Sequence, residues 1–379
     1  MTELLARAAA GRKRTIALIR RLVECESPSL EARAVRRFTE LLAEELAPLA
    51  GVRAYPGGRF GPHLSCDFRL PGGRREGRIL LLAHSDTVWP LGTLERMPFR
   101  HAQGRLWGPG VLDMKAGIAL AIEAARLLIE LERPVRRRVT LLVTSDEEVG
   151  SPSSRPLIER EARRSTAVLV LEPGTGPEGK LKTARKGVGV YTLRVRGRAA
   201  HAGVDFASGV NAIVELARQI GRVAGFTRLA RGVTVSPGVI RGGSRSNVIP
   251  EEAEVEIDVR VPRLRDAEQL EARFRALRPS DERCTLEVRG GLNRPPMERS
   301  PGGVRLFRLA QGLARQIGLE LEESLSGGGS DGNFTAALGV PTLDGLGAVG
   351  EGAHAEHESV LAERLPDRMA LLAGLIEAI

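Results

Sequence analysis

Short apolar runs that end abruptly in polar residues constrain the fold of this chain most. Three of them are "RILLLA" (78–83), "VTLLVT" (139–144) and "AVLVL" (167–171). A strand without polar alternation has to be covered on both faces, which is typical of parallel sheets flanked by helices. Helical patterns alternate with these runs, among them 31–50 and 114–132. The sequence therefore predicts an α/β domain with a largely parallel sheet.

The pattern changes near residue 180. Segments such as "GVGVYTLRVRG" and "EEAEVEIDVRV" alternate apolar and polar residues, as half-buried strands do, and two helical patterns lie between them. The order strand-helix-strand-strand-helix-strand indicates a ferredoxin-like α+β insert at 180–291. Helical patterns return afterwards, so we expect 1–179 and 292–379 to form the two parts of the α/β domain.

Composition and charge limit the classes of protein that we consider. The 379 residues carry a formal net charge of +9, which allows the alternative of a non-catalytic, basic nucleic-acid-binding protein. The basic residues are spread over the chain and aromatic residues are scarce, so we expect no nucleic-acid partner. No run of about 18 apolar residues is present and the N-terminus does not resemble a signal peptide, so we expect a cytoplasmic protein without a membrane span. Cys25, Cys66 and Cys284 lie too far apart to indicate a disulfide framework or a thiolate metal site.

Polar residues that bind metals or move protons follow each of the three apolar runs. His84 and Asp86 follow the first run, Glu147 and Glu148 the second, and Glu172 the third. In an α/β sheet, ligands collect at the carboxyl ends of parallel strands. We therefore expect these side chains to lie at one edge of the sheet.

Two further segments add candidates. Asp113 lies on the glycine-rich turn "LWGPGVLDMKAG" before an apolar helix, and "GAHAEHESV" offers His354 and His357. Converging carboxylates repel one another unless cations neutralise them. Imidazole and carboxylate ligands together suit zinc, or else cobalt or manganese. The sequence thus predicts a pair of divalent cations.

The succession His-x-Asp, "GPGVLDMKAG", Glu-Glu, Glu-Pro and a late histidine resembles the di-zinc aminoacylase and carboxypeptidase family. The resemblance covers nearly the whole chain. It is closest to the bacterial glutamate carboxypeptidase branch in "GRAAHAGVDFASGVNAIVELA", "SNVIPEEAEVEIDVRV" and "GGGSDGNFTAALGVPTLDGLG". It implies a metal-dependent hydrolase with two Zn²⁺ ions, in which 1–179 and 292–379 form the catalytic domain and 180–291 a dimerisation domain.

The resemblance also implies the metal ligands. Asp113 would bridge both cations, followed by a cis peptide bond, and His84 and Glu172 would complete one site. Glu148 and a late histidine would complete the other. Family members place this histidine four or five residues before a glutamate, which favours His354 over His357.

Three catalytic roles follow from the same resemblance. Glu147 would be the general base, and Asp86 would orient His84 through its second ring nitrogen. His201, in the insert, would donate to the oxyanion in the active site of a partner subunit, which implies a homodimer.

Substrate binding is assigned by resemblance to Asn247, Arg260, Arg294, Gly328 and Gly329. The glycine-rich turn could point amides at an anion, or simply be a loop with Ser330 or Asp331 as helix cap. The expected reaction is hydrolysis of an amide bond that releases a C-terminal amino acid, glutamate for preference, from a peptidyl, folate-like or N-acyl substrate. An N-acetyl-amino-acid deacetylase or a dipeptidase with the same metal site is the alternative.

Overall fold

The computed structural model describes residues 1–73 and 76–379, and the chain packs into two compact units. The first unit comprises Met1–Ala184, Arg299–Ser326 and Ser330–Ile379, and the second comprises Arg185–Glu298 and Gly327–Gly329. The second unit is thus an insert within the sequence of the first. The domain bounds of 180 and 291 drawn from the sequence pattern stay predictions.

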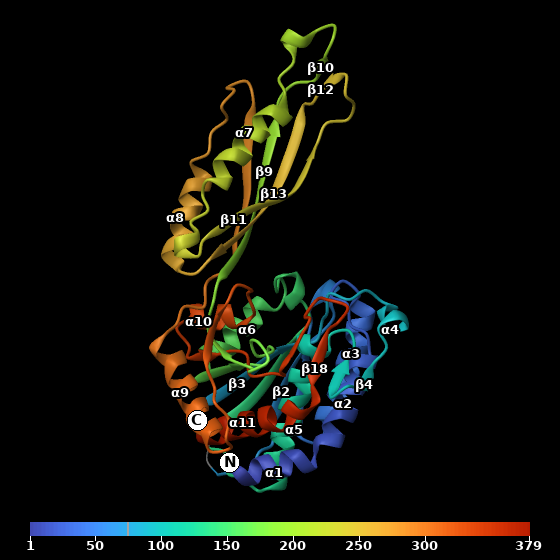
Figure 1. Cartoon of the computed structure of the whole chain (residues 1–379), viewed down its shortest axis with the longest axis vertical. Helices are drawn as coiled ribbons and strands as arrows, with labels where there is room; N and C mark the ends of the chain where they lie inside the picture. Colours follow the sequence, from blue (N-terminus) through green and yellow to red (C-terminus); the bar gives the residue numbers. More distant parts are fainter. Residues whose placement is uncertain (74–75) are drawn as a thin grey trace. The chain divides into compact units, whose positions relative to one another are not determined.

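A six-stranded sheet with the order β1-β2-β6-β3-β7-β16 forms the centre of the first unit (Figure 1). Its strands are β1 (Ala50–Tyr55), β2 (His63–Phe68), β3 (Arg78–His84), β6 (Arg138–Thr144), β7 (Ala167–Val170) and β16 (Thr342–Leu343). The four strands β6, β3, β7 and β16 run parallel to one another. At the other edge, β1 pairs with β2 and β2 with β6 in antiparallel fashion. The predicted α/β fold with a largely parallel sheet is confirmed.

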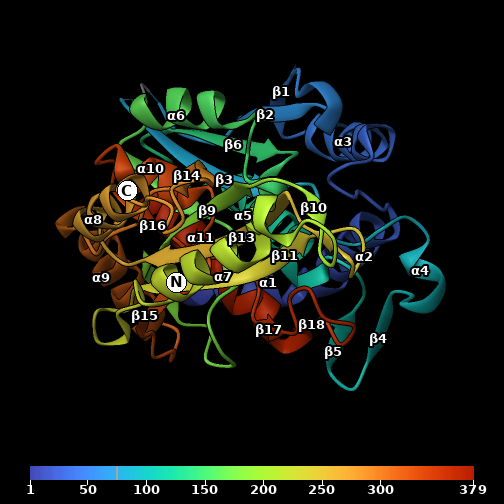
Figure 2. The same cartoon turned by 90° about the horizontal axis from the view of Figure 1, so that it is seen from above.

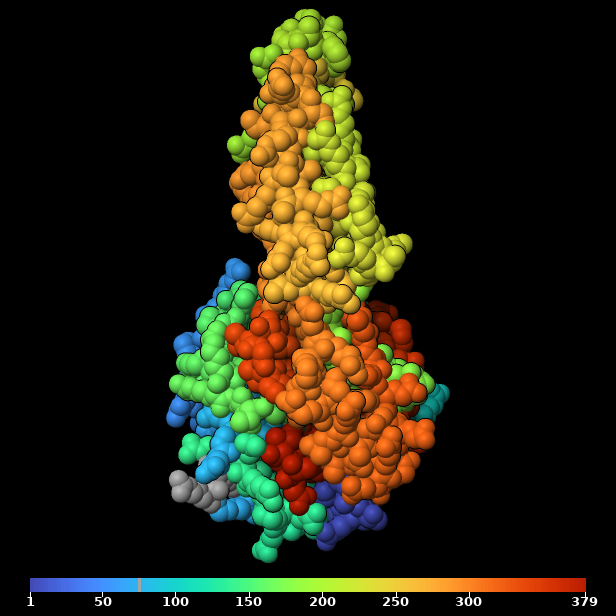
Figure 3. Space-filling view, turned by 90° about the vertical axis from the view of Figure 1, so that its left-hand side faces the viewer, coloured from blue at the N-terminus to red at the C-terminus, as the bar shows by residue number. Residues whose placement is uncertain are grey.

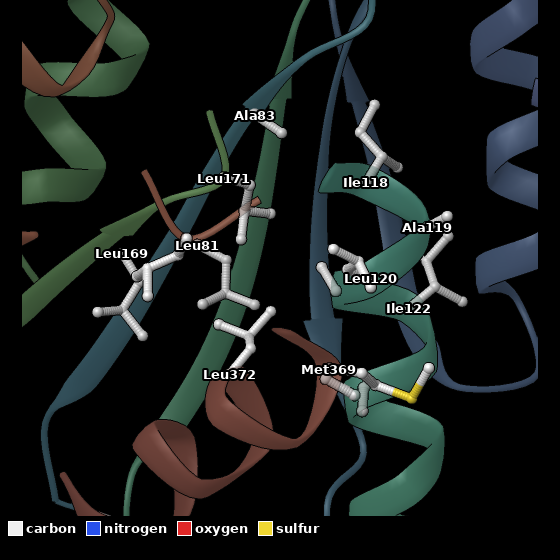
Figure 4. Close-up of a cluster of buried hydrophobic side chains, with 14 of the residues drawn as sticks. Leu81, Ala83, Ile118, Ala119, Leu120, Ile122, Leu169, Leu171, Met369 and Leu372 are labelled. Carbon is white, nitrogen blue, oxygen red and sulfur yellow. The ribbon is translucent and has the colours of Figure 1, made fainter. Parts of the chain in front are cut away.

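Helices cover both faces of this sheet (Figure 2). They are α1 (Thr2–Ala10), α2 (Arg12–Glu24), α3 (Ala32–Leu46), α5 (Ala116–Glu130), α6 (Arg155–Arg163), α9 (Pro301–Arg315), α10 (Gly332–Ala337) and α11 (Leu365–Ala378). Leu81 packs with Ile118 of α5 and Leu372 of α11 in one apolar cluster (Figure 4). Its neighbour Leu82 points to the opposite face, where Ile158 of α6 lies. Successive strand residues therefore enter two separate cores, which explains the uninterrupted apolar run.

Small elements complete the first unit. A four-stranded sheet has the order β17-β18-β5-β4, and β15 pairs with β8. The strands are β4 (Arg100–Ala102), β5 (Arg105–Trp107), β8 (Leu181–Arg185), β15 (Glu323–Ser326), β17 (Gly350–Glu351) and β18 (Ser359–Leu361). A short helix, α4 (Thr93–Arg96), precedes β4. Single turns are Gly58–Phe60, Val111–Lys115, Glu147–Val149 and Ala362–Arg364. The pairing of β18 with β5 brings the C-terminal part of the chain beside the turn that carries Asp113.

The second unit has the predicted ferredoxin-like order. Its main elements are β9 (Gly187–Arg196), α7 (Ala212–Ala224), β11 (Thr234–Gly242), β13 (Glu252–Val261), α8 (Leu264–Arg275) and β14 (Thr285–Arg294). A short ladder joins β10 (Ala200–His201) to β12 (Val248–Ile249), and turns occupy Phe206–Ser208 and Leu229–Arg231. The antiparallel sheet β11-β13-β9-β14 buries alternate residues, such as Leu193 and Ile257, together with residues of α7 and α8. In the space-filling view of Figure 3, the atoms of these two segments, coloured yellow-green and gold, lie on one face of this unit.

Two further observations concern the whole described chain. Cys25, Cys66 and Cys284 are all free thiols. Within residues 1–73 and 76–379, no helix combines the length and the apolar character that crossing a bilayer requires.

Candidate metal centre

The carboxyl ends of β6, β3 and β7 lie side by side, and three of the predicted ligands follow them. In the parallel register, His84 at the end of β3 is opposite Thr144 of β6, and Leu82 is opposite Val170 of β7. Glu148 lies in the single turn after β6, and Glu172 lies just beyond β7. The parallel strands therefore present these side chains at one edge of the sheet.

Asp113 reaches the same edge from the turn between β5 and α5. Gly110 starts this turn with a φ of +70°, and a Cβ there would lie 2.6 Å from Thr87 Cγ2. Glycine is therefore required where the turn passes the end of β3. The peptide bond between Asp113 and Met114 is cis.

Two groups of ligand atoms share Asp113. His84 Nε2 lies 3.1 Å from Asp113 Oδ1 and 3.7 Å from Glu172 Oε1. His354 Nε2 lies 3.4 Å from Asp113 Oδ2 and 3.2 Å from Glu148 Oε2. Within each group the ligand atoms lie within 4.8 Å of one another. One carboxylate thus offers one oxygen to each of two adjacent cation sites.

The late histidine in these groups is His354, which has a φ of +64° in the loop between β17 and β18. His357 is exposed and belongs to neither group. The structure therefore brings together all five predicted metal ligands, whereas their role as ligands stays a prediction.

Asp86 links the end of β3 to the turn after β6. The main-chain oxygen of Asp86 lies 2.9 Å from His84 Nδ1, and its carboxylate oxygen Oδ1 lies 3.5 Å away. The same carboxylate accepts the backbone N–H groups of Glu147 and Glu148 at 3.2 and 3.1 Å, and the Ser29 hydroxyl at 2.7 Å. His84 Nδ1 therefore meets main-chain oxygen first, while the Asp86 carboxylate chiefly fixes the turn that carries both glutamates.

The electrostatics of the two groups favour bound positive charge. Burial opposes a charge on His84, but its contacts with Asp113 and Asp86 raise its pKa well above the usual value. Hydrogen bonds to Asp113 and Glu148 raise the pKa of His354 to about 10. Burial raises the pKa of Glu148. The carboxylates of both groups thus attract positive charge to the two imidazoles.

The donor atoms fit divalent cations. Imidazole nitrogen and carboxylate oxygen are the ligands that zinc, cobalt and manganese bind in proteins. Glu148 Oε1 is buried and has no hydrogen-bond partner among the residues that the structure describes. A buried carboxylate oxygen without a donor is costly unless a cation binds it.

Two sequence-predicted residues lie close together in the second unit. His201 of β10 is opposite Val248 of β12, and the carbonyl of Asn247 accepts the N–H of Ala202 at 2.9 Å. His201 is exposed, and its Nδ1 accepts the N–H groups of Gly203 and Val204 at 3.1 and 3.2 Å. The neutral ring therefore carries its proton on Nε2, which can act as a donor.

The remaining substrate-binding candidates also belong to the second unit. Arg294 is buried at the end of β14 and packs against Gly329, where a Cβ would lie 2.8 Å from Arg294 Cδ. Arg260 pairs with the Asp258 carboxylate at 2.9 Å, so much of its charge is already compensated. The residue that the sequence analysis missed is Arg185, whose guanidinium donates to the carbonyls of Gly328 and Gly329 at 3.1 Å each.

The helix after the glycine-rich turn is α10. Its N-cap residue is Asp331, whose side chain forms no capping hydrogen bond. Ser330 Oγ accepts the N–H of Gly332 at 3.1 Å and donates to Asp344 at 2.7 Å. The Asp331 carboxylate instead accepts the hydroxyls of Thr144 and Ser151.

Glu358 is the second residue that the motifs did not single out. It was used only to choose between His354 and His357, yet it is buried and accepts hydrogen bonds from the turn that carries Asp113. In the sequence, the only signal that could have pointed to Glu358 was its place directly before a short apolar strand.

The comparisons with known proteins agree with this fold and this arrangement of ligands. A family model described as peptidase family M20/M25/M40 matches residues 80–378. The chain is 32% identical over 311 residues to carboxypeptidase G2 of a Pseudomonas species, covering 80% of this chain and 74% of the relative. It is 28% identical over 360 residues to a succinyl-diaminopimelate desuccinylase of Thioalkalivibrio sulfidiphilus, covering 89% and 92%.

Solved structures share the fold over nearly the whole chain. The aminopeptidase PepT of Bacillus cereus superposes with a TM-score of 0.81 at 23% identity and covers 97% of this chain and 98% of its own. A metallo-carboxypeptidase of Sulfolobus solfataricus gives 0.75 at 15% identity, covering 96% and 98%.

Fold, ligand arrangement and relatives define a metal-dependent hydrolase. The chain belongs to peptidase family M20/M25/M40. The resemblance found in the sequence and the prediction of an enzyme are both confirmed, in place of the non-catalytic alternative.

Proposed function

We propose that the protein is a dinuclear zinc amidohydrolase that releases a C-terminal amino acid, glutamate for preference, from a peptidyl, folate-like or N-acyl substrate. The observation that carries this proposal is the pair of ligand groups that share Asp113. The identity with carboxypeptidase G2 supports the carboxypeptidase branch of the family. The preference for glutamate comes from the motif resemblance.

The metal site would use all five predicted ligands. His84 and Glu172 would bind one cation, Glu148 and His354 the other, and Asp113 both. Zinc suits this donor set, and cobalt or manganese would also fit. When bound, the two cations supply Lewis-acid activation of the scissile carbonyl and of water.

Glu147 would move the protons. Hydrolysis forms a C–O bond from water and breaks the amide C–N bond, so a proton has to leave the water and a proton has to reach the amine nitrogen. The Glu147 carboxylate would accept the first and deliver it to the leaving amine. The support is its place directly before Glu148 on a turn that Asp86 fixes through both backbone N–H groups.

His201 would stabilise the oxyanion that forms when the carbonyl is attacked. Because Nδ1 accepts two backbone N–H groups, the Nε2–H of the neutral ring is available as a donor. As the family resemblance implies, His201 would act in the active site of a partner subunit.

A homodimer is therefore part of the proposal. The supporting observation is β11, an edge strand of its sheet, on which Val239 and Ile240 are exposed. Ile213 of α7 is also exposed and lies beside Gly242 at the end of this strand. An open edge strand with exposed apolar residues offers a surface with which another chain can pair.

Recognition of the substrate carboxylate would rest on the second unit. Arg294 and Arg260 would supply the cationic groups; Arg294 is buried at the end of β14, and Arg260 pairs with the Asp258 carboxylate. Asn247, Gly328 and Gly329 would add polar contacts.

The second candidate function is an N-acyl-amino-acid deacetylase or a dipeptidase with the same metal site. The relatives named succinyl-diaminopimelate desuccinylase support the N-acyl side of this alternative. Both candidates share the metal ligands and Glu147, and they differ in the leaving half.

A substrate panel tests the proposal. The purified protein, loaded with zinc, is assayed on folate, N-benzoyl-glutamate, N-acetyl amino acids, N-succinyl amino acids and dipeptides, each with and without a chelator. We expect the highest kcat/KM on the glutamate-releasing substrates and loss of all turnover with the chelator. Higher kcat/KM on N-acetyl or N-succinyl substrates would favour the alternative, and no turnover on any of them would contradict both.

A further inference from the structure

The side chain of Glu358 is fully buried and is surrounded by hydrogen-bond donors from the turn that carries Asp113. Oε1 accepts the backbone N–H groups of Leu112 at 2.8 Å and Asp113 at 3.1 Å. Oε2 accepts the N–H of Gly110 at 2.9 Å and the indole N–H of Trp89 at 2.8 Å. One carboxylate thus holds three backbone amides of a single turn.

This environment calls for a carboxylate. No lysine, arginine or histidine forms an ion pair with Glu358 within the described parts of the chain, so its direct partners are neutral N–H groups. The buried Lys115 ammonium attracts the Glu358 charge from beyond hydrogen-bond distance. An ionised carboxylate has four acceptor positions and no donor, whereas glutamine would turn an NH₂ group toward two of the N–H donors. Hydrogen bonds to a charged acceptor are also stronger than those to a neutral one.

Glu358 also belongs to the segment that carries His354. This loop runs from β17 to β18, and Glu358 is its last residue before β18. The Glu358 N–H donates to the carbonyl of Ala355 at 2.9 Å, which closes the loop upon itself. The next residue, Ser359, pairs with Trp107 of β5, so the backbone on both sides of Glu358 is fixed.

Two candidate ligands therefore depend on one side chain. Asp113 and His354 come from segments far apart in the sequence, yet Asp113 Oδ2 and His354 Nε2 lie 3.4 Å from each other. We propose that Glu358 is a positioning residue of the metal centre, which sets the distance between the Asp113 carboxylate and the His354 imidazole by binding the backbone of the Asp113 turn. This inference rests on the proposed dinuclear function, and it assigns Glu358 no contact with substrate.

The test compares metal binding in Glu358→Gln, Glu358→Asp and the wild type. Zinc affinity is measured by titration against a competing chelator, folding by the melting temperature, and ligand geometry by the visible absorption spectrum of the cobalt-loaded protein. We expect Glu358→Gln to bind zinc about 10- to 100-fold more weakly, as is usual when a residue that holds a ligand is changed. Its cobalt spectrum should change, kcat should fall at saturating zinc, and Glu358→Asp should recover part of the affinity.

Two matched variants separate positioning from general damage. Glu161→Gln changes another buried carboxylate, on α6, and should leave zinc affinity and the cobalt spectrum unchanged. Trp89→Phe removes one of the four donors but leaves the three backbone amides in place, so its zinc affinity should fall less than that of Glu358→Gln.

Each outcome decides the inference. A folded Glu358→Gln with wild-type zinc affinity and cobalt spectrum would overturn it, and so would equal losses in Glu358→Gln and Trp89→Phe. Failure of Glu358→Gln to fold would also overturn it, because Glu358 would then be a requirement of folding. A wild type that binds no metal would instead contradict the proposed function itself.

Discussion

His354 Nε2 lies 3.2 Å from Glu148 Oε2, although Glu148 follows a strand of the central sheet and His354 lies in a loop near the C-terminus. The same nitrogen faces Asp113, and the two carboxylates raise the pKa of His354 to about 10. This contact closes the second of the two ligand groups. The first two predictions concern it directly.

The first prediction concerns the choice between the two late histidines. His354→Ala should lower the zinc content, because it removes the one imidazole of the second group. His357→Ala is the control and should keep full zinc content, since its exposed ring belongs to neither group. Zinc per subunit, measured after gel filtration, checks both variants, and loss of zinc from His357→Ala would contradict the assignment.

The second prediction separates Glu147 from its neighbour Glu148. Glu147→Gln should retain zinc and lose at least about a hundredfold in kcat, since it removes the proposed base but no ligand. Glu148→Gln should lose zinc as well as activity. Zinc analysis and steady-state rates distinguish them, and activity within about tenfold of the wild type in Glu147→Gln would exclude Glu147 as the base.

The third prediction concerns His201 and the partner subunit. His201→Ala and Glu147→Gln should each be nearly inactive, but subunit exchange between them should restore activity. One site of each mixed dimer then has an intact Glu147 from one chain and an intact His201 from the other. Half of the dimers are mixed, so about a quarter of the wild-type activity per site should return. If exchange is demonstrated independently and no activity returns, His201 does not act in trans.

The fourth prediction concerns the stability of the second unit and its dependence on pH. The buried Glu215 carboxylate accepts the N–H groups of Ser280 at 2.7 Å and Asp281 at 3.1 Å, and the amide of Gln219 at 2.7 Å. Burial alone would raise the pKa of Glu215, but these hydrogen bonds lower it. A lowered pKa stabilises the fold above the unfolded value of about 4.3, and this stabilisation is lost as the pH falls through the folded pKa.

Glu215→Gln should therefore lower the free energy of unfolding by roughly 1–3 kcal/mol at pH 7. The difference from the wild type should shrink once the pH falls below about 4. Urea unfolding of the metal-free protein at each pH measures it, with Glu268→Gln on the exposed side of α8 as the control. A difference that does not change with pH would contradict a role for the charged carboxylate.

The fold could be predicted to a large extent because local patterns determine it. The apolar run from Ile79 to Ala83 needs cover on both faces, and the structure supplies it from α5 and α11 on one side and α6 and α10 on the other. Strands in which apolar and polar residues alternate, with two helical patterns between them, likewise predicted the ferredoxin-like unit. The alternation arises because only one face of its sheet packs on the helices.

The roles of Asp86 and Glu358 show where prediction from the sequence ends. The orienting role of Asp86 toward His84 stays a prediction, with its carboxylate 3.5 Å from His84 Nδ1. The same carboxylate also accepts the backbone N–H groups of Glu147 and Glu148, which the sequence did not indicate. Glu358 was only a marker of spacing, and it proves to bind the Asp113 turn. In both cases the partners are backbone amides, which every residue except proline possesses and which no motif can reveal.

The sequence by itself determined which side chains gather at the sheet edge, because parallel strands of uninterrupted apolar residues deliver the polar residues after them to the same side. Only the tertiary structure decided which imidazole meets which carboxylate. The pairing of β18 with β5 brings the His354 loop to the Asp113 turn, and the distance between the two ligands depends on hydrogen bonds between segments that are far apart in the chain.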